Sequence, residues 1–280
     1  MQIVNAVRAE GPVKKDPHHQ FSTLPYHLWC CDGEVYIVKF KQNPEGYLAL
    51  VNEYVCYKLA KLLELPIAEA ALINVDHAFV EVYGEEISQF IGEPLQPGVH
   101  YGSKKIMKAS PVSSHRLIQS SSNSHLVPNI LLFDQWIGNC DRDANKGNML
   151  FDMLKKEIVI IDHSHVFELG VLWGLYKGSI QLNRLIGSPF KVYEHQGCIF
   201  SKLAHIVKGN NPFSDIISKM GRITNEQLWN IIDEVPLEWG LTYDEKKTLH
   251  NFLCERLGRI TDALPVLSSV LPYWKGGVPV

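Results

Sequence analysis

One stretch of the chain, residues 127–167, joins a helix signal, two polar loops and two short strands in a fixed order. Residues 127–138 are apolar at helical spacing and end at Gly138, where turn-forming residues begin. The apolar runs 149–151 and 158–161, with charged residues between them, are typical of a β-hairpin. Any fold of this chain must therefore accommodate a helix end, a hairpin and the two polar loops that flank it.

Carboxylates and amides are concentrated in these two loops. Asp141, Asp143, Asn145 and Asn148 lie in the first loop, and Asp162 directly follows the second strand of the hairpin. Hard oxygen ligands of this kind suit Mg²⁺, which usually keeps part of its coordination shell for water and phosphates. Asp and Asn are also common in ordinary turns, so the position of Asp162 is what favours a metal and phosphate site.

The order of these residues matches a plan used for phosphoryl transfer, in which a catalytic Asp is followed by a metal-binding Asn, a hairpin and a second metal-binding Asp. Here the order is Asp141, Asn148, Asp162. The words GNCDR, GNML and IDHSHVF resemble the HipA-like kinase domain of bacteria and, more loosely, the phosphatidylinositol kinases. The resemblance implies that Asp141 orients a hydroxyl nucleophile and that Asn148 and Asp162 bind the metal.

The spacing within the first loop leaves a second candidate for the catalytic Asp. Kinases place the metal-binding Asn five residues after that Asp, but the residue five positions after Asp141 is Lys146. Counting back from Asn148 gives Asp143 instead. We expect Asp141 to orient the nucleophile, because the Asn-x-Asp-Arg motif of the family matches at this position, and Asp143 is the alternative. Arg142 is expected to brace the loop rather than contact substrate.

A second hairpin is predicted near the N-terminus, where two β-rich runs meet at the Asp-Gly pair of residues 32–33. Lys39 ends the second run, on the face opposite its apolar neighbours, and this face is expected to be open to water or to a ligand. The resemblance implies that Lys39 pairs with nucleotide phosphates and that Ser22 and Thr23 help to cover them. The turn that holds Ser22 and Thr23 lacks the glycines usual at such a site.

The clearest helix of the N-terminal half is predicted at residues 47–63. Glu53 lies off its apolar stripe and, considered alone, is typical of a solvated residue. In HipA-like proteins a strand ending in Lys-Phe is followed by a helix with a Glu and then by a Leu-Pro segment, which NEYVCYKLAKLLELPIAEA fits. The resemblance therefore implies that Glu53 forms an ion pair with Lys39 and positions it.

The remaining elements are assigned by shorter patterns. Strand-like runs at 70–75 and 78–82 would complete a mostly antiparallel sheet. The word HYGSKKIM resembles the family's strand leading to an interlobe hinge, with Lys104 to Met107 as the span expected to meet adenine. The serine-rich segment 110–124 is predicted to be a flexible connector, with a phosphoacceptor segment as the alternative. Three helices are predicted after residue 167, at 200–207, 225–235 and 243–264.

These elements predict an α+β fold, and the resemblance makes it a bilobal protein-kinase-like one. Residues 1–107 would form a small antiparallel-sheet N-lobe with one helix, and residues 108–280 a mainly helical C-lobe. The formal charge of −3 argues against bulk electrostatic binding of nucleic acid. No run is long and apolar enough to span a membrane and no early secretion signal is evident, so we expect a soluble cytoplasmic protein.

The expected function is that of an ATP- and Mg²⁺-dependent HipA-like kinase that transfers the γ-phosphoryl group to a hydroxyl. Ser or Thr of a protein is the expected acceptor, and the sequence does not distinguish it from a lipid or small-molecule acceptor. A nucleotide-binding pseudokinase or interaction module is one alternative, favoured by Lys146, the glycine-poor loop and Ser164, which stands where the family has Gly. A metal-dependent hydrolase using Asp162, His163 and His165 is the other.

Overall fold

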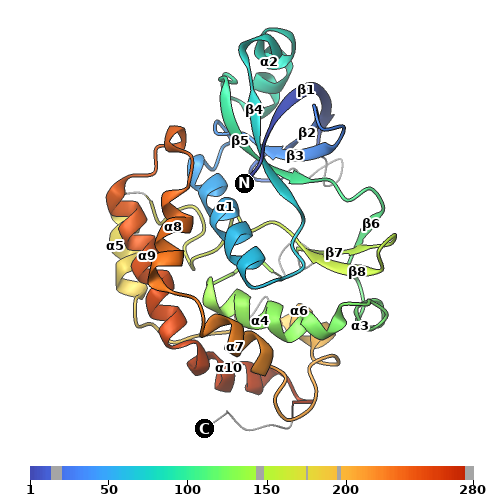
Figure 1. The fold of residues 1–280 in the computed structure, drawn as a ribbon, viewed down its shortest axis with the longest axis vertical. Helices are drawn as coiled ribbons and strands as arrows, with labels where there is room; N and C mark the ends of the chain where they lie inside the picture. The colour runs from blue at the N-terminus through green and yellow to red at the C-terminus, as the bar shows by residue number, and fades with distance from the viewer. Residues whose placement is uncertain (14–20, 143–147, 175, 194–196, 275–280) are drawn as a thin grey trace. The chain divides into compact units, whose positions relative to one another are not determined.

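The computed structural model describes residues 1–13, 21–142, 148–174, 176–193 and 197–274 (Figure 1). It is a mixed α+β structure whose chain divides into two compact units. Unit 1 comprises Met1–Tyr57, Ala68–Met107 and Val235–Leu241, and unit 2 comprises Lys58–Ile67, Lys108–Glu234 and Thr242–Val280. Most of unit 1 is sheet, and most of unit 2 is helix.

Unit 1 is built on a closed five-stranded barrel with the strand order β1-β2-β3-β5-β4. Strands β1 and β4 pair in parallel and every other neighbouring pair is antiparallel. The hairpin predicted at residues 32–33 joins β2 to β3, and Gly33 adopts the positive φ (82°) that its turn requires. The barrel strands are β1 (Ile3–Pro12), β2 (Tyr26–Cys30), β3 (Val35–Lys39), β4 (Ala70–Val75) and β5 (Gly98–Lys104).

Helix α1 (Tyr47–Leu62) forms where the sequence predicts it, but the strand predicted at 78–82 is wrong. Those residues lie in helix α2 (His77–Ile91), because Asp76 caps the helix by accepting a hydrogen bond from the Phe79 backbone N at 2.8 Å. Phe79, Ile87 and Ile91 then recur at helical spacing and join the barrel core. A run as short as residues 78–82 cannot distinguish strand from helix, whereas the longer window does.

Unit 2 carries a small antiparallel sheet in the order β6-β7-β8 and most of the helices. The predicted helix at 127–138 and the hairpin that follows it are both present, as α4 and β7–β8. The strands are β6 (Ala109–Pro111), β7 (Met149–Asp152) and β8 (Glu157–Ile160). The helices are α3 (His115–Gln119), α4 (Val127–Trp136), α5 (Tyr176–Leu185), α6 (Gly197–Leu203), α7 (Ser214–Met220), α8 (Asn225–Asp233), α9 (Tyr243–Gly258) and α10 (Ala263–Val270).

The serine-rich segment 110–124 is more ordered than a connector. Ser114 caps α3 by accepting a hydrogen bond from the Leu117 backbone N at 3.3 Å. The Asn123 side chain holds strand β8 by exchanging two 2.9 Å hydrogen bonds with the backbone of Ile158. The prediction of a flexible connector is therefore wrong, since several of the small polar residues in this segment act as caps and clamps.

The single helix predicted at 243–264 is two helices, α9 and α10. Helix α9 ends at Gly258, a short 3₁₀ turn (Ile260–Asp262) follows, and α10 begins at Ala263. Pro265 accounts for the new start, because it cannot donate a backbone hydrogen bond and is tolerated only in the first turn of a helix.

One buried histidine makes the stability of unit 1 depend on pH. His100 on β5 is fully buried, accepts a hydrogen bond from the Lys41 backbone N at 3.0 Å and packs edge-on against Phe40. Burial, and secondarily the nearby Lys41 charge, lower the pKa of His100 to about 3. The folded protein therefore binds a proton at this site less readily than the unfolded chain does.

We predict that this histidine contributes to acid destabilisation. Because its pKa falls on folding, its contribution is fully present above about pH 6.5 and is lost as the pH falls toward 3, at up to about 1.4 kcal/mol per pH unit. Substitution His100→Gln should make the free energy of unfolding less dependent on pH between about 6.5 and 5, where few carboxyl groups titrate. Urea unfolding across this range measures the slope, and an unchanged slope in the variant would contradict the assignment.

Candidate functional site

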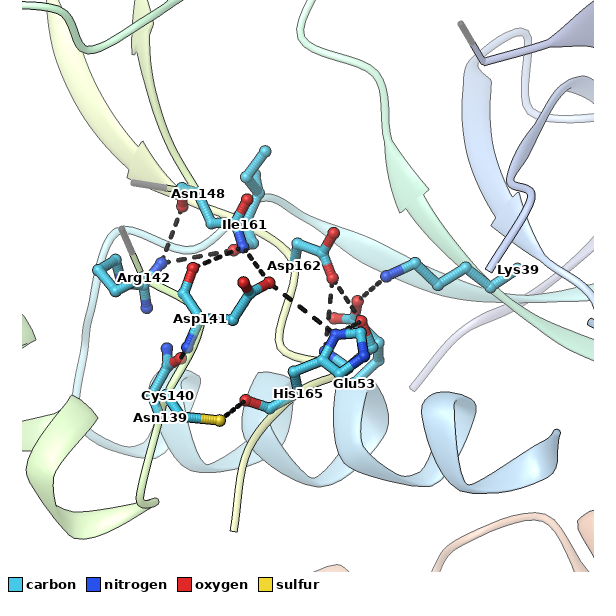
Figure 2. A network of polar contacts seen from close by, with 11 residues as sticks. Lys39, Glu53, Asn139, Cys140, Asp141, Arg142, Asn148, Ile161, Asp162 and His165 are labelled. Carbon is cyan, nitrogen blue, oxygen red and sulfur yellow. Dashed lines mark hydrogen bonds and ion pairs between the residues drawn. The ribbon is translucent and has the colours of Figure 1, made fainter. Parts of the chain in front are cut away.

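In unit 1, the last residue of β3 pairs with the helix that follows it. The Lys39 ammonium makes an ion pair with the Glu53 carboxylate of α1, and both side chains are buried (Figure 2). The ion pair that the resemblance implied is thus present. The face bearing Lys39 was expected to be open to water or to a ligand: at Lys39 it is closed to water, and access to a ligand stays a prediction. A buried ion pair adds little net stability because desolvation offsets its attraction. It does fix the position of a cation, which is a feature common at functional sites.

The other nucleotide-binding candidates of unit 1 lie in different settings. Ser22 is exposed on a turn whereas Thr23 is buried beside it. Lys104, at the end of β5, makes a partly exposed ion pair with Glu34 at 2.7 Å, and Met107, the last residue of this part of unit 1, is exposed. A role for any of these four residues stays a prediction.

In unit 2, the Arg142 guanidinium is the hub of the two polar loops. It is buried and makes a two-pronged ion pair with Asp134 of α4, with Nε–Oδ2 at 2.8 Å and Nη2–Oδ1 at 2.7 Å. Its Nη1 donates to the carbonyl oxygens of Asn148 (2.8 Å) and Ile161 (3.4 Å), and its Nη2 lies 3.0 Å from His163 Nε2. Arg142 therefore ties α4 to both loops, and the prediction that it braces the loop is confirmed.

The Asp141 side chain lies against Asn148, as Figure 2 shows. Asn148 Nδ2 donates to Asp141 Oδ2 at 3.0 Å, and the Asp141 backbone N donates to Asn139 Oδ1 at 3.0 Å. Asn148 has a positive φ of 41°, a conformation that Asn tolerates better than most residues. The alternative catalytic residue, Asp143, lies outside the described residues.

Asp162 follows β8 and is held by its own loop. Ser164 Oγ donates to Asp162 Oδ1 at 2.7 Å, and the Ser164 backbone N lies 3.4 Å from the same oxygen. The left-handed residue of this loop is Asp162 itself, with a φ of 55°, and Ser164 has no positive φ. The replacement of the family's Gly by Ser thus adds a hydrogen bond to the carboxylate without backbone strain at position 164. The Ile161 backbone N donates to Asn148 O at 3.1 Å, which links this loop to the first one.

The family can now be stated from comparisons with known proteins. The family model described as "HipA-like kinase" matches residues 15–171, more than half of the chain. The chain belongs to the HipA-like kinase family. Among solved structures it is similar to the crystal structure of a Helicobacter pylori proinflammatory kinase, CtkA, with a TM-score of 0.55 and 16% identity over 96% of this chain and 98% of that chain. A search of curated proteins found no match.

At that identity the solved structure supports the fold alone, and the family supports kinase activity. Within the described ranges, no helix is long and apolar enough to cross a membrane.

The metal-binding candidates of this HipA-like kinase fit a magnesium site better than a zinc site. The amide nitrogen of Asn148 donates a hydrogen bond to Asp141, so its amide oxygen is the atom suited to bind a cation. Asp162, 14 residues later in the chain, supplies a carboxylate. Mg²⁺ needs only one or two carboxylates because water and phosphates complete its shell. In the part of the chain that the structure describes, no three His, Cys, Asp or Glu residues form a metal-binding group. His163, a candidate zinc ligand of the hydrolase alternative, is buried against Arg142 and Phe133.

The residues that sequence reasoning missed are those that hold the loops. Asp134 is the one charged residue of the mostly apolar helix α4, and this isolation was an available signal for a buried partner. The ion pair between Glu168 and Arg256 (2.7 Å) joins residues 88 positions apart, and no local pattern indicates it.

We predict that removing the Arg142 side chain is strongly destabilising. The substitution Arg142→Ala leaves the Asp134 carboxylate buried without its counter-charge, which should cost about 3–5 kcal/mol of unfolding free energy. The matched control Arg116→Ala removes an exposed arginine of α3 and should cost less than about 1 kcal/mol. Urea unfolding of both variants measures the difference, and equal costs would show that Arg142 is not the hub described here.

Proposed function

We propose that this HipA-like kinase uses ATP and Mg²⁺ to phosphorylate a hydroxyl group, with Ser or Thr of a protein as the acceptor. The observation that carries the proposal is the contact between Asp141 and Asn148, with Asp162 linked to Asn148 through the adjacent Ile161. The residue order is the one that phosphoryl transfer uses for a catalytic Asp and a metal-binding Asn, and the hydrogen bond holds the two side chains next to each other. The buried Lys39–Glu53 ion pair of unit 1 supports it independently.

The two units also support a bilobal arrangement. We infer that residues 1–107 form the N-lobe and residues 108–280 the C-lobe of a protein-kinase-like fold. The sheet-rich character of unit 1, the helical character of unit 2 and the similarity to a kinase structure support this inference. Two segments depart from this division, because residues 235–241 group with unit 1 and residues 58–67 group with unit 2.

In the proposed mechanism, each side chain has one task. Asp141 accepts a hydrogen bond from the acceptor hydroxyl, aligns its oxygen with the γ-phosphorus and takes its proton as the new P–O bond forms and ADP leaves. Asn148 and Asp162 would hold Mg²⁺, which neutralises phosphate charge when bound. Lys39, held by Glu53, would pair with the nucleotide phosphates. Catalysis would then come from positioning and from electrostatic stabilisation of the transferring group.

The remaining contacts to ATP are assigned by position in the chain. Ser22 and Thr23 would lie over the phosphates, and the span from Lys104 to Met107 would meet the adenine ring. The exposed Ser22 hydroxyl suits such a contact better than the buried Thr23 side chain, whose backbone N–H would serve instead.

The proposed role of Asp141 predicts a loss of turnover without a loss of nucleotide binding. The substitution Asp141→Asn keeps the shape of the side chain but removes the proton acceptor, so kcat should fall about 10²–10⁴-fold. Transfer of labelled γ-phosphate from ATP to protein substrates or to the enzyme itself measures kcat, and isothermal titration with Mg-ATP measures binding. A fall in Asp143→Asn with wild-type turnover in Asp141→Asn would move the role to Asp143.

Two further variants separate the nucleotide site from the rest of the surface. Lys39→Ala should weaken ATP binding by about tenfold or more, because the phosphates lose a desolvated cation. Lys247→Ala removes an exposed lysine of α9 and serves as the matched control with unchanged binding. Equal ATP affinity in both variants would exclude Lys39 from the site.

A further inference from the structure

Unit 2 contains a buried ion pair whose two residues have no role in the proposed mechanism. The side chains of Arg256 on α9 and of Glu168, which follows the second polar loop, are both 3% exposed, with Nη1 and Oε1 2.7 Å apart. Burial lowers the pKa of Arg256 and the Glu168 charge opposes that effect. A buried ion pair of this kind adds little net stability. Its role therefore lies in the chain segments that it holds together.

The first segment that the pair holds is the end of helix α4. Arg256 Nε donates to Trp136 O at 2.9 Å and Nη2 donates to Gln135 O at 2.6 Å. The last carbonyl groups of a helix have no partner within the regular helix, and the guanidinium donates to two of them, of which Gln135 O also accepts from the Gly138 backbone N at 3.2 Å. The guanidinium charge thus lies at the negative end of the helix dipole. The chain enters the loop of Asp141 directly after this point.

The second segment is the chain that follows Asp162. The backbone N of Phe167 donates to Ile137 O at 2.8 Å, and that of Glu168 donates to Gly138 O at 3.0 Å. Phe167 and Glu168 have positive φ values of 57° and 61°, which cost energy for residues other than Gly and persist only where surrounding contacts hold them. A Cβ added at Gly138 would lie 2.8 Å from Glu168 Cγ, so the backbone at Gly138 is in close contact with the Glu168 side chain.

A third segment returns to the same pair. The Arg256 guanidinium lies over the Phe190 ring, 4.4 Å from its centre, and Lys191 Nζ lies 3.3 Å from Glu168 Oε2. Gln135 Nε2 also donates to Lys191 O at 3.2 Å. The Glu168–Arg256 pair is therefore the point at which three segments meet: α4, the chain leaving the Asp162 loop, and residues 190–191. We call this point the three-segment junction.

From these contacts we infer that Glu168 and Arg256 are positioning residues for phosphoryl transfer: they fix the start of the Asp141 loop against the chain that leaves the Asp162 loop. The inference rests on the proposed function of Asp141 and Asp162. A catalytic carboxylate displaced by about 1 Å can cost about a hundredfold in rate even when the altered residue is remote from the chemistry. The pair thus acts through the two loops and does not touch the substrate.

The test compares Arg256→Lys and Glu168→Gln with a matched control at Arg259, the residue that follows the end of α9. Arg259→Lys alters an arginine whose ion pair with Glu255 (2.6 Å) is partly exposed and lies outside the three-segment junction. Turnover is measured per folded molecule, well below each variant's melting temperature. We expect kcat to fall about tenfold to a hundredfold in the two junction variants, with KM for ATP within about twofold of wild type. Arg259→Lys should keep wild-type kcat. Wild-type kcat in both junction variants would overturn the inference.

A second measurement decides the inference even if the wild-type protein transfers no phosphate. Hydrogen exchange at the backbone amides of Phe167 and Glu168 reports the two bonds to Ile137 and Gly138, and we expect it to be about tenfold faster in Glu168→Gln than in wild type. Exchange at these amides in Arg259→Lys should match wild type. Unchanged exchange in Glu168→Gln would overturn the inference, whereas absent turnover in wild type with faster exchange in the variant would overturn the proposed function and leave standing only that the pair fixes the two loops against each other. Faster exchange with wild-type kcat would reduce the pair to a structural role.

Discussion

The buried ion pair between Arg142 and Asp134 is the interaction on which the candidate site depends. The Asp134 carboxylate satisfies two of the guanidinium nitrogens, and the remaining donor capacity reaches the backbone oxygens of Asn148 and Ile161. Asn148 is itself a proposed ligand of the metal, and Ile161 directly precedes the other proposed ligand, Asp162. An arginine suits this task because its planar fork offers five donors in fixed directions, which a lysine cannot reproduce.

The loops held in this way are not relaxed. Asn148, Asp162, Phe167 and Glu168 all have positive φ values, and each is a residue other than Gly. Backbone of this kind is found where surrounding contacts hold a conformation that the local sequence does not favour, and it clusters at functional sites. Arg142 supplies such contacts on one side of the two loops. The Glu168–Arg256 pair supplies them on the other, since it holds the chain as it leaves the Asp162 loop against the end of α4.

Much of this architecture could be predicted from the sequence wherever the signal is local. The hairpins β2–β3 and β7–β8 and the helices α1 and α4 follow from turn residues and apolar periodicity. The strand predicted at 78–82 is wrong because that run is too short to show a period, whereas the longer window that includes the cap Asp76 indicates a helix. The closure of the barrel depends on the parallel pairing of β1 with β4, about 70 residues away, which no local pattern encodes.

The site divides in the same way. The roles expected for Lys39, Glu53, Asp141, Asn148 and Asp162 came from a family resemblance, and the structure adds the contacts that these residues make. Arg142 was expected to brace its loop, but its partner Asp134 and the distant Glu168–Arg256 pair were found only in the structure. Contacts between residues far apart in the sequence are set by packing, which a single sequence does not show.

The central claim, that a nucleotide and Mg²⁺ bind together at Asp162, is tested most directly by thermal unfolding of the intact chain with ATP, with and without Mg²⁺. A ligand that binds only the folded state adds about 2.7 kcal/mol of stability at a hundredfold excess over its Kd. We expect ATP to raise the melting temperature of the wild type, to raise it further with Mg²⁺, and to lose the Mg²⁺-dependent part in Asp162→Ala. No rise in the wild type, or the same Mg²⁺-dependent rise in Asp162→Ala, would contradict the account.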